Sequence, residues 1–307
     1  MKINAIQISK LILRILIGIM FLTTATLKLL SIDEFELYIY SFGIFNYISV
    51  TVLARFVIAF EFLLGLFLLL KQFYKQVWWL MQLTLIGFTL FLIYVALFRN
   101  DANCHCFGDF VELNPLHSII KNVLTIALLL FVRKETDYQL RYRKIVIGTC
   151  FAVAVILPFV VFPMDAVYNK FRSPKDPINI VAFEKLQQDT TLRNFNIEQG
   201  NYLLAFYIPR CKFCRLSMKK VNAIVNKYQL DIDRIKIFIC GDDSAVDEFK
   251  NETEALDYQF FQISPILAID ITYGHFPTFI YISNQELKNC VDLRGIEEED
   301  IVQFLQK

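Results

Sequence analysis

The stretch Tyr202-Leu-Leu-Ala-Phe-Tyr-Ile-Pro-Arg-Cys-Lys-Phe-Cys214 decides the fold of the C-terminal part of this 307-residue chain. Residues 202–208 are a continuous apolar run of strand length, which is typical of a buried central strand. Residues 215–228 follow with helical spacing, and their apolar face consists of Leu216, Val221, Ile224 and Val225. The pair Cys211 and Cys214 therefore lies at the start of a helix that follows a buried strand.

This position of the cysteine pair favours thiol–disulfide exchange. A helix start carries partial positive charge and free N–H groups that stabilise a thiolate, and the cations nearby are Arg210, Lys212 and Arg215. We expect Cys211 to be the attacking sulfur and Cys214 to resolve the mixed disulfide. A structural disulfide is one alternative. Half of a zinc site is another, although the sequence has no second Cys-x-x-Cys to complete it.

The rest of this region alternates between strand and helix patterns. Buried strands are predicted near 234–240 and 278–282, with a further strand at 286–293. Polar, amphipathic segments predict helices at 243–254 and 297–305, and 183–188 begins a helix or a strand. Strands that alternate with helices predict an α/β sheet domain.

The segment His275-Phe276-Pro277-Thr278 precedes a predicted strand about 60 residues after the cysteine pair. With the Cys-x-x-Cys helix, it makes the region from about 180 to 307 resemble the thioredoxin superfamily. That resemblance implies that Pro277 is a cis-proline lying against the active-site sulfurs.

The N-terminal part predicts a polytopic membrane protein. The chain is 56% hydrophobic, and its net charge of +1 gives no field that suggests nucleic acid as a partner. Five stretches are long and apolar enough to span a lipid bilayer; they are Ile8–Leu30, Val50–Leu70, Val77–Phe98, Leu116–Val132 and Ile145–Phe162. The first lacks a small-residue cleavage site, so we expect it to be retained. The fourth is the weakest, because it is short and contains Lys121 and Asn122.

Basic residues alternate between the loops. They gather before the first stretch, after the second and after the fourth, whereas loops 31–49 and 99–115 are acidic. Because basic loops stay in the cytoplasm, we expect a cytoplasmic N-terminus, with loop 99–115 and residues 163–307 on the opposite side.

A second cysteine pair lies in loop 99–115, within Asn103-Cys104-His105-Cys106-Phe107-Gly108. Two cysteines one residue apart close a small, strained disulfide ring, which is easier to reduce and therefore a better oxidant. The loop lies at the bilayer surface, where a lipid-soluble quinone can approach, and His117 is placed to shuttle a proton. A metal site that uses Cys104, Cys106, His105 or His117 is an alternative, as is a structural disulfide.

Residues 1–135 resemble the DoxX-like membrane family, in particular its MauE (methylamine utilisation) branch. The matching features are Arg14, Gly18, Lys28, Glu61, Gly65, Cys-x-Cys-Phe-Gly at 104–108, Asn114-Pro115 and Lys121-Asn122. The resemblance implies a four-helix bundle similar in plan to vitamin K epoxide reductase and DsbB-type quinone-linked enzymes. It also implies a role in forming disulfides in an exported protein. The fifth span and the thioredoxin-like region depart from that family, so a methylamine dehydrogenase subunit need not be the client.

Charged residues inside the predicted spans are costly in lipid and need partners. We expect Glu61 and Lys121 to line a polar pocket beneath the Cys-x-Cys loop, where a quinone headgroup or a proton path lies; Lys28 is also able to reach Glu61. A structural salt bridge is the alternative. Arg14 is close enough to the cytoplasmic face to snorkel and has a structural role.

The remaining cysteines are Cys150, Cys240 and Cys290, and we expect all three to be packing residues. A Cys240–Cys290 disulfide is not expected, because their strands lie on opposite sides of the central strand in a thioredoxin sheet.

The sequence thus predicts a helical membrane domain (1–135), a fifth helix and linker (136–180) and a thioredoxin-like domain (181–307). We expect a multi-pass protein of a bacterial cell membrane whose C-terminal domain is periplasmic or extracytoplasmic. Exported clients with cysteine pairs would pass electrons through Cys211/Cys214 and Cys104/Cys106 to a membrane quinone, with no metal. The alternative is a non-catalytic assembly or metal-binding factor whose thioredoxin-like domain holds clients.

Overall fold

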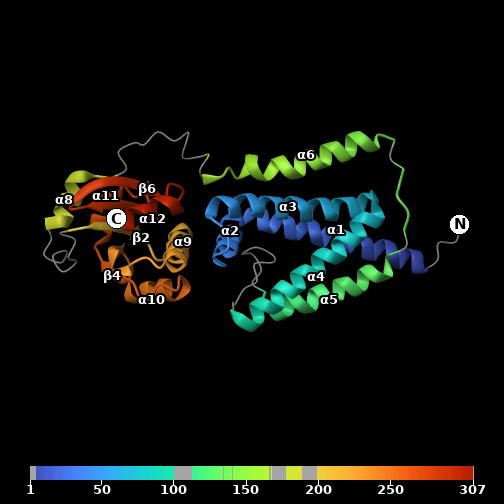
Figure 1. Ribbon diagram of the computed structural model, residues 1–307, viewed down its shortest axis with the longest axis horizontal. Coiled ribbons are helices and arrows are strands. Elements are labelled where there is room, and N and C mark those ends of the chain that lie inside the picture. The colour runs from blue at the N-terminus through green and yellow to red at the C-terminus, as the bar shows by residue number, and fades with distance from the viewer. Residues whose placement is uncertain are drawn as a thin grey trace. The chain divides into compact units, whose positions relative to one another are not determined.

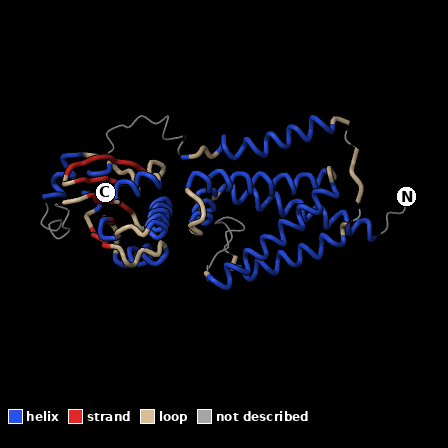
Figure 2. Tube along the Cα trace, in the orientation of Figure 1, coloured by secondary structure: helices blue, strands red, loops and turns tan. Residues whose placement is uncertain are grey.

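The computed structural model describes residues 5–99, 113–133, 135–139, 141–165, 167, 178–188 and 199–306. The chain divides into two compact units, one of residues 1–39 and 49–163 and the other of residues 40–48 and 164–307. The long apolar helices belong to the first unit and the strands to the second (Figure 2).

The membrane unit contains the helices α1 (Ala5–Leu30), α2 (Ile32–Tyr40), α3 (Tyr47–Leu70), α4 (Tyr74–Phe98), α5 (Pro115–Phe131) and α6 (Arg143–Val161) (Figure 1). Among the described residues, α1, α3, α4 and α6 are long and apolar enough to cross a membrane, and α5 is apolar but shorter. These five helices coincide with the five predicted stretches, so the chain is an integral membrane protein. The short helix α2 was not predicted, because acidic residues alternate with its apolar residues and the segment resembles a polar loop.

Helices α1 and α3 approach each other closely at two glycines. A Cβ atom on Gly65 would lie 2.9 Å from the carbonyl oxygen of Gly18, and a Cβ on Gly18 would lie 2.6 Å from the side chain of Leu69. Small residues allow such contact between membrane helices, where dispersion rather than exclusion of water favours association. Only glycine fits at this crossing without a shift of one helix.

At one end of the bundle, an acidic residue of the α5–α6 connection neutralises two cations. Glu135 pairs with Arg14 of α1 at 3.4 Å and with Lys71 at the end of α3. Arg14 is only 6% exposed, so it does not snorkel as predicted. It is a structural residue that holds a loop carboxylate.

At the opposite end, Arg55 of α3 connects three helices. Its guanidinium pairs with Glu36 of α2 and donates to the carbonyl oxygens of Thr51 and Phe162, the latter just after α6, at 2.7 Å each. Arg99, which follows α4, lies over the ring of Tyr38 in α2. The end of α4 and the end of α6 are therefore at the same end of this unit.

The second unit contains α8 (Ile180–Gln188), β2 (Asn201–Tyr207), α9 (Lys212–Tyr228), the 3-10 turn η2 (Ile232–Arg234), β3 (Ile235–Ile239), α10 (Asp243–Glu252), β4 (Gln259–Gln262), α11 (Pro265–Thr272), β5 (Thr278–Ser283), β6 (Glu286–Asp292) and α12 (Glu298–Leu305). The sheet has the order β4-β3-β2-β5-β6. Strands β2, β3 and β4 are parallel, and β5 and β6 are antiparallel to their neighbours. This is the predicted thioredoxin-like α/β fold, with β2 at its centre.

Both faces of β2 are buried. Leu204 and Phe206 pack in one core with residues of α8 and α11, and Phe206 stacks on Phe238 of β3 with 4.9 Å between ring centroids. On the other face, Tyr207 contacts Phe249 of α10 and Phe279 of β5. A strand covered on both faces reads as an unbroken apolar run, which is why β2 was predictable. Strand β4 and helix α11 were not predicted; β4 is a four-residue edge strand whose ends are glutamines.

Candidate functional site

Cys211 caps the N-terminus of α9. Its backbone is extended (φ −80°, ψ 120°), and its sulfur accepts a hydrogen bond from the N–H of Cys214 at 3.4 Å. The first N–H groups of a helix have no partner within the helix. The Cys211 sulfur occupies the place that a serine or aspartate oxygen takes in an ordinary N-cap.

These contacts lower the pKa of Cys211 to about 6. The largest cause is the hydrogen bond from the Cys214 side chain, and the N–H groups of Cys214 and Phe213 add to it; burial opposes the shift. Because only the thiolate attacks a disulfide, Cys211 is ionised and nucleophilic near neutral pH.

Cys214 has the opposite environment. Its side chain is fully buried, and burial is the main reason that its pKa is raised far above that of an ordinary thiol. The N–H of Ile208 donates to its sulfur at 3.5 Å. The pair thus combines a half-buried, ionised sulfur with a buried, neutral one, as the predicted division of roles requires.

The basic residues around the pair contribute less than predicted. Arg215 donates to the Pro209 carbonyl at 2.9 Å and pairs with Glu252 at 2.5 Å, so its charge is already matched. Arg210 is exposed and 3.9 Å from Asp242. The causes that lower the pKa of Cys211 are hydrogen bonds, not these cations.

The Phe276–Pro277 peptide bond is cis, as the thioredoxin resemblance implied, and Pro277 is buried whereas His275 is exposed. In the antiparallel pair of β2 and β5, Phe206 lies opposite Thr278. Pro277 therefore sits at the edge of the sheet where β2 leads into the cysteine motif.

A second cluster of buried ionisable groups lies in the membrane unit. The Lys28 ammonium of α1 is 2.5 Å from Glu61 of α3, and the residues are 2% and 7% exposed. Lys28 also lies over the rings of Phe88 and Phe35, at 5.1 and 5.4 Å. The other carboxylate oxygen of Glu61 is buried without a hydrogen-bond partner in the described part of the chain.

The structure therefore pairs Glu61 with Lys28, one of the two lysines that were expected to be able to reach it. Lys121 is half-buried and His117 exposed on α5, and their roles stay predictions. Asn122, next to Lys121, is 2% exposed, and its amide nitrogen is buried without a described partner. Cys104 and Cys106 lie outside the described residues, so their predicted disulfide and the alternatives remain predictions.

The three other cysteines are free. Cys150 is half-buried in α6. Cys240 directly follows β3 and Cys290 lies in β6, with β2 and β5 between those strands, so the two do not pair, as predicted. Cys240 is nonetheless close to the redox pair, which the sequence analysis missed: its sulfur contacts the carbonyl oxygen of Tyr207 at 3.6 Å.

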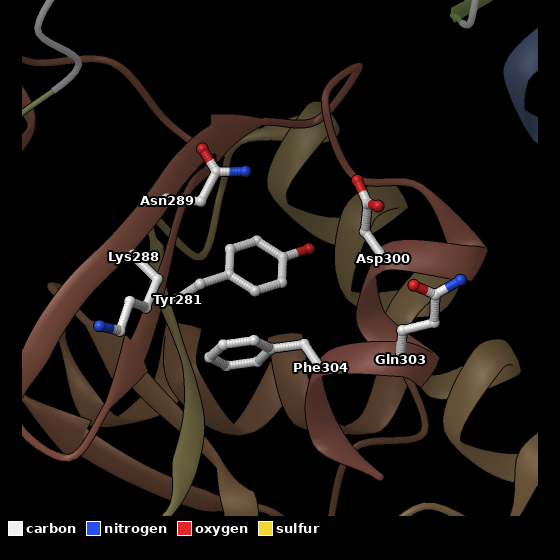
Figure 3. Close-up of a pocket in the computed structure, with 6 residues that line it drawn as sticks. All are labelled: Tyr281, Lys288, Asn289, Asp300, Gln303 and Phe304. Carbon is white, nitrogen blue, oxygen red and sulfur yellow. The ribbon is translucent and has the colours of Figure 1, made fainter. Parts of the chain in front are cut away.

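A hollow of about 230 Å³ lies between β5, β6 and α12. Figure 3 shows the Tyr281 hydroxyl pointing toward the side on which Asp300 lies, and the Tyr281 and Phe304 rings make an edge contact at 5.1 Å. Its lining includes no residue of the cysteine motif or of the cis-proline loop, so it is separate from the redox site.

Known proteins resemble this chain in part or over most of its length. Residues 6–133 match the family described as methylamine utilisation protein MauE. Protein TlpB of Flavobacterium psychrophilum is 25% identical over 308 residues, which cover 82% of this chain and 83% of that protein.

Among solved structures, two thioredoxin-like proteins were found. One is a secreted Mycobacterium tuberculosis disulfide oxidoreductase homologous to Escherichia coli DsbE, with 12% identity and a TM-score of 0.29 over 36% of this chain and 83% of that chain. The other is MTB DsbF, with 13% identity and a TM-score of 0.29 over 36% and 81%. The strand order and the cysteine helix described above carry the fold assignment. Residues 6–133 form a MauE family domain, and a thioredoxin-like domain follows it in the same chain.

Proposed function

We propose that this protein is a membrane thiol–disulfide oxidoreductase that forms disulfides in exported client proteins. The observation that carries the proposal is the asymmetry of its outer pair, with an ionised Cys211 at the start of α9 and a buried, neutral Cys214 behind it. A thiolate with a low pKa is a good leaving group as well as a nucleophile. That property suits a disulfide that gives its oxidising equivalents to a client.

The first exchange oxidises the client. A client thiolate attacks the sulfur of Cys211 in the Cys211–Cys214 disulfide, that bond breaks, and Cys214 leaves and takes up a proton. The second client thiolate then attacks the mixed disulfide and displaces Cys211 as a thiolate. The client gains one disulfide, and the protein holds two electrons as the Cys211/Cys214 dithiol.

The second exchange regenerates the pair. The Cys211 thiolate attacks the proposed Cys104–Cys106 disulfide, and Cys214 resolves the resulting mixed disulfide, which leaves the Cys104/Cys106 dithiol. That dithiol gives two electrons and two protons to a membrane quinone, so a hydroquinone is released and the Cys104–Cys106 disulfide is restored.

The geometry of the membrane unit supports the shared location that this route needs. Arg55, Tyr38 and Phe162 bring the end of α4 and the end of α6 to one end of the bundle. The segment with Cys104 and Cys106 follows α4, and the linker to the thioredoxin-like domain follows α6. Both couples therefore follow helices that finish at the same end of the membrane unit, and the predicted orientation has that end outside the cytoplasm of a bacterial cell.

Glu61, Lys28, Lys121 and His117 are the residues that we propose for the quinone headgroup and its protons. The Lys28 ammonium lies over the ring of Phe88, and Phe88, Leu113 and Ile119 all pack against Leu92 of α4. The second carboxylate oxygen of Glu61, which is buried, is a hydrogen-bond acceptor with no described partner. A reduced quinone hydroxyl is a suitable donor to it.

The relay is tested with the full chain in lipid nanodiscs and a soluble quinone analogue. The wild-type protein is expected to oxidise a dithiol substrate with hydroquinone formed in equal amount, and Cys106→Ser is expected to abolish turnover. Cys150→Ser is the matched control, because it removes a thiol from a membrane helix outside the proposed route. A Cys106→Ser protein that turns over at the wild-type rate would contradict the relay.

A further inference from the structure

Cys240 is a buried thiol that the proposed electron route does not use. It follows β3, is 8% exposed and forms no disulfide. Both its N–H and its thiol contact the carbonyl oxygen of Tyr207, at 3.2 and 3.6 Å. Burial raises the pKa of Cys240, so the sulfur is protonated and acts as a hydrogen-bond donor.

The acceptor of this thiol belongs to the peptide group that serves Cys214. The carbonyl of Tyr207 and the N–H of Ile208 are the two ends of one peptide unit, and that N–H donates to the sulfur of Cys214 at 3.5 Å. A continuous chain thus runs from the Cys240 thiol through one peptide to the Cys214 sulfur. A donor on the carbonyl oxygen polarises the peptide and makes its N–H a stronger donor. The gain is greatest when the acceptor is ionised.

The same arrangement keeps Cys240 from competing as a third redox thiol. In a trans peptide the carbonyl and the N–H point in opposite directions, so the two sulfurs contact opposite ends of this peptide. A disulfide needs the sulfurs about 2 Å apart. Gly241, which follows Cys240, packs closely on Pro209, since a Cβ atom there would lie 2.8 Å from the Pro209 ring.

We propose that Cys240 is a positioning residue for Cys214: its thiol, acting through the Tyr207–Ile208 peptide, stabilises the Cys214 thiolate that resolves mixed disulfides. The proposal rests on the thiol–disulfide exchange proposed above for Cys211 and Cys214. It deepens that proposal, because it names a residue that sets the rate of one step without contact to the client.

Two variants without the thiol separate the hydrogen bond from the packing. Cys240→Ser keeps a donor of similar size, and Cys240→Val fills the site without a donor. The readout is the pH dependence of the resolving step, in the full chain with Cys104→Ser and Cys106→Ser to isolate the outer pair. An aromatic disulfide reacts with the Cys211 thiolate, and Cys214 then attacks the mixed disulfide and releases a second coloured thiolate in a concentration-independent phase.

The Val variant is expected to slow the resolving step about twofold to threefold, from the loss of cooperative polarisation on a charged hydrogen bond. Its pH midpoint is expected to move upward, whereas the Ser variant keeps the wild-type profile. Cys290→Val is the control, because β6 is separated from β3 by two strands.

Identical profiles for Cys240→Val and Cys240→Ser would overturn the role of Cys240 while leaving the proposed exchange intact. A wild-type protein in which Cys211 forms no mixed disulfide would overturn both.

Discussion

The two units differ in the groups that stabilise their buried charges. In the membrane helices each buried charge has an opposite charge beside it, as in Lys28–Glu61 and Arg55–Glu36. In the thioredoxin-like domain the Cys211 charge is stabilised by N–H groups and a neighbouring thiol. A fixed charge in lipid needs a permanent partner, whereas a sulfur that gains and loses charge in each cycle needs donors that tolerate both states. The ion pairs of the membrane helices therefore stabilise charges that do not change, whereas the cysteine site stabilises a charge that forms and disappears in each cycle.

The largest expected effect on activity comes from removing the thiolate of Cys211. Cys211→Ser is expected to abolish disulfide exchange with clients, because a serine hydroxyl does not ionise near neutral pH and forms no disulfide. Mixed-disulfide formation with a thiol-labelled client peptide measures this loss. Cys290→Ser, on an outer strand, is the matched control, and residual exchange by Cys211→Ser would show that another sulfur is the nucleophile.

The buried ion pairs of the membrane helices are tested by removing one partner. Lys28→Met is expected to destabilise the membrane unit by about 3–5 kcal/mol, because Glu61 is left as an uncompensated buried charge. Thermal unfolding in detergent measures the loss.

The double variant Lys28→Met/Glu61→Met is the matched comparison, and it is expected to recover most of that stability. A double variant no more stable than the single one would show that packing, not charge pairing, is what Lys28 contributes.

The glycine crossing sharpens the comparison, since the ion pair depends on how closely α1 and α3 approach. Gly65→Ala is expected to cost about 1–3 kcal/mol, because its methyl group meets the backbone of Gly18 and the helices must separate. Gly87→Ala in α4 is the control, as a Cβ there meets nothing within 4 Å. Equal stability of the two variants in the same unfolding assay would contradict the close crossing.

The smallest effect is a pH dependence that only the cysteine site shows. Alkylation of Cys211 in the reduced protein is expected to rise with pH and to level off above a midpoint of about 6, set by the lowered pKa. The pKa of the folded thiol lies below the ordinary value of 9.0. The reduced domain therefore gains stability as the pH rises from about 6 to about 9 and loses it as the pH falls through the folded value. An alkylation midpoint near 9 would contradict the lowered pKa of Cys211.

Much of the fold was predictable because its signals are local. Strand β2 is an unbroken apolar run, α9 has its apolar face at helical spacing, and α1, α3, α4 and α6 are apolar helices long enough to cross a bilayer, with α5 a shorter apolar helix. The elements that escaped prediction are short: α2 has nine residues, β4 four and α11 eight, and each depends on neighbours to bury a few side chains. Propensity alone does not distinguish such segments from loops.

The residues of the site also fall into those predictable from local sequence and those that depend on tertiary contacts. Cys211 and Cys214 were predicted from a Cys-x-x-Cys motif between a strand pattern and a helix pattern, and Pro277 was predicted from the resemblance to the thioredoxin superfamily. The causes of the Cys211 pKa were predicted only in part: the free N–H groups follow from the helix start, but the cations prove to be engaged elsewhere. The pairing of Glu61 with Lys28 and the pairing of Glu36 with Arg55 depend on how the helices rotate against each other.

The sequence by itself determined which segments are helices or strands, which cysteines begin a helix and which loops carry basic residues. Each of these follows from side chains a few positions apart. The tertiary structure decided the pairs: Lys28 with Glu61, Arg14 with Glu135 and Cys240 with the peptide behind Cys214. Those contacts join residues at least 33 positions apart. They form only where helix crossings and strand order, which no local pattern specifies, bring the partners together.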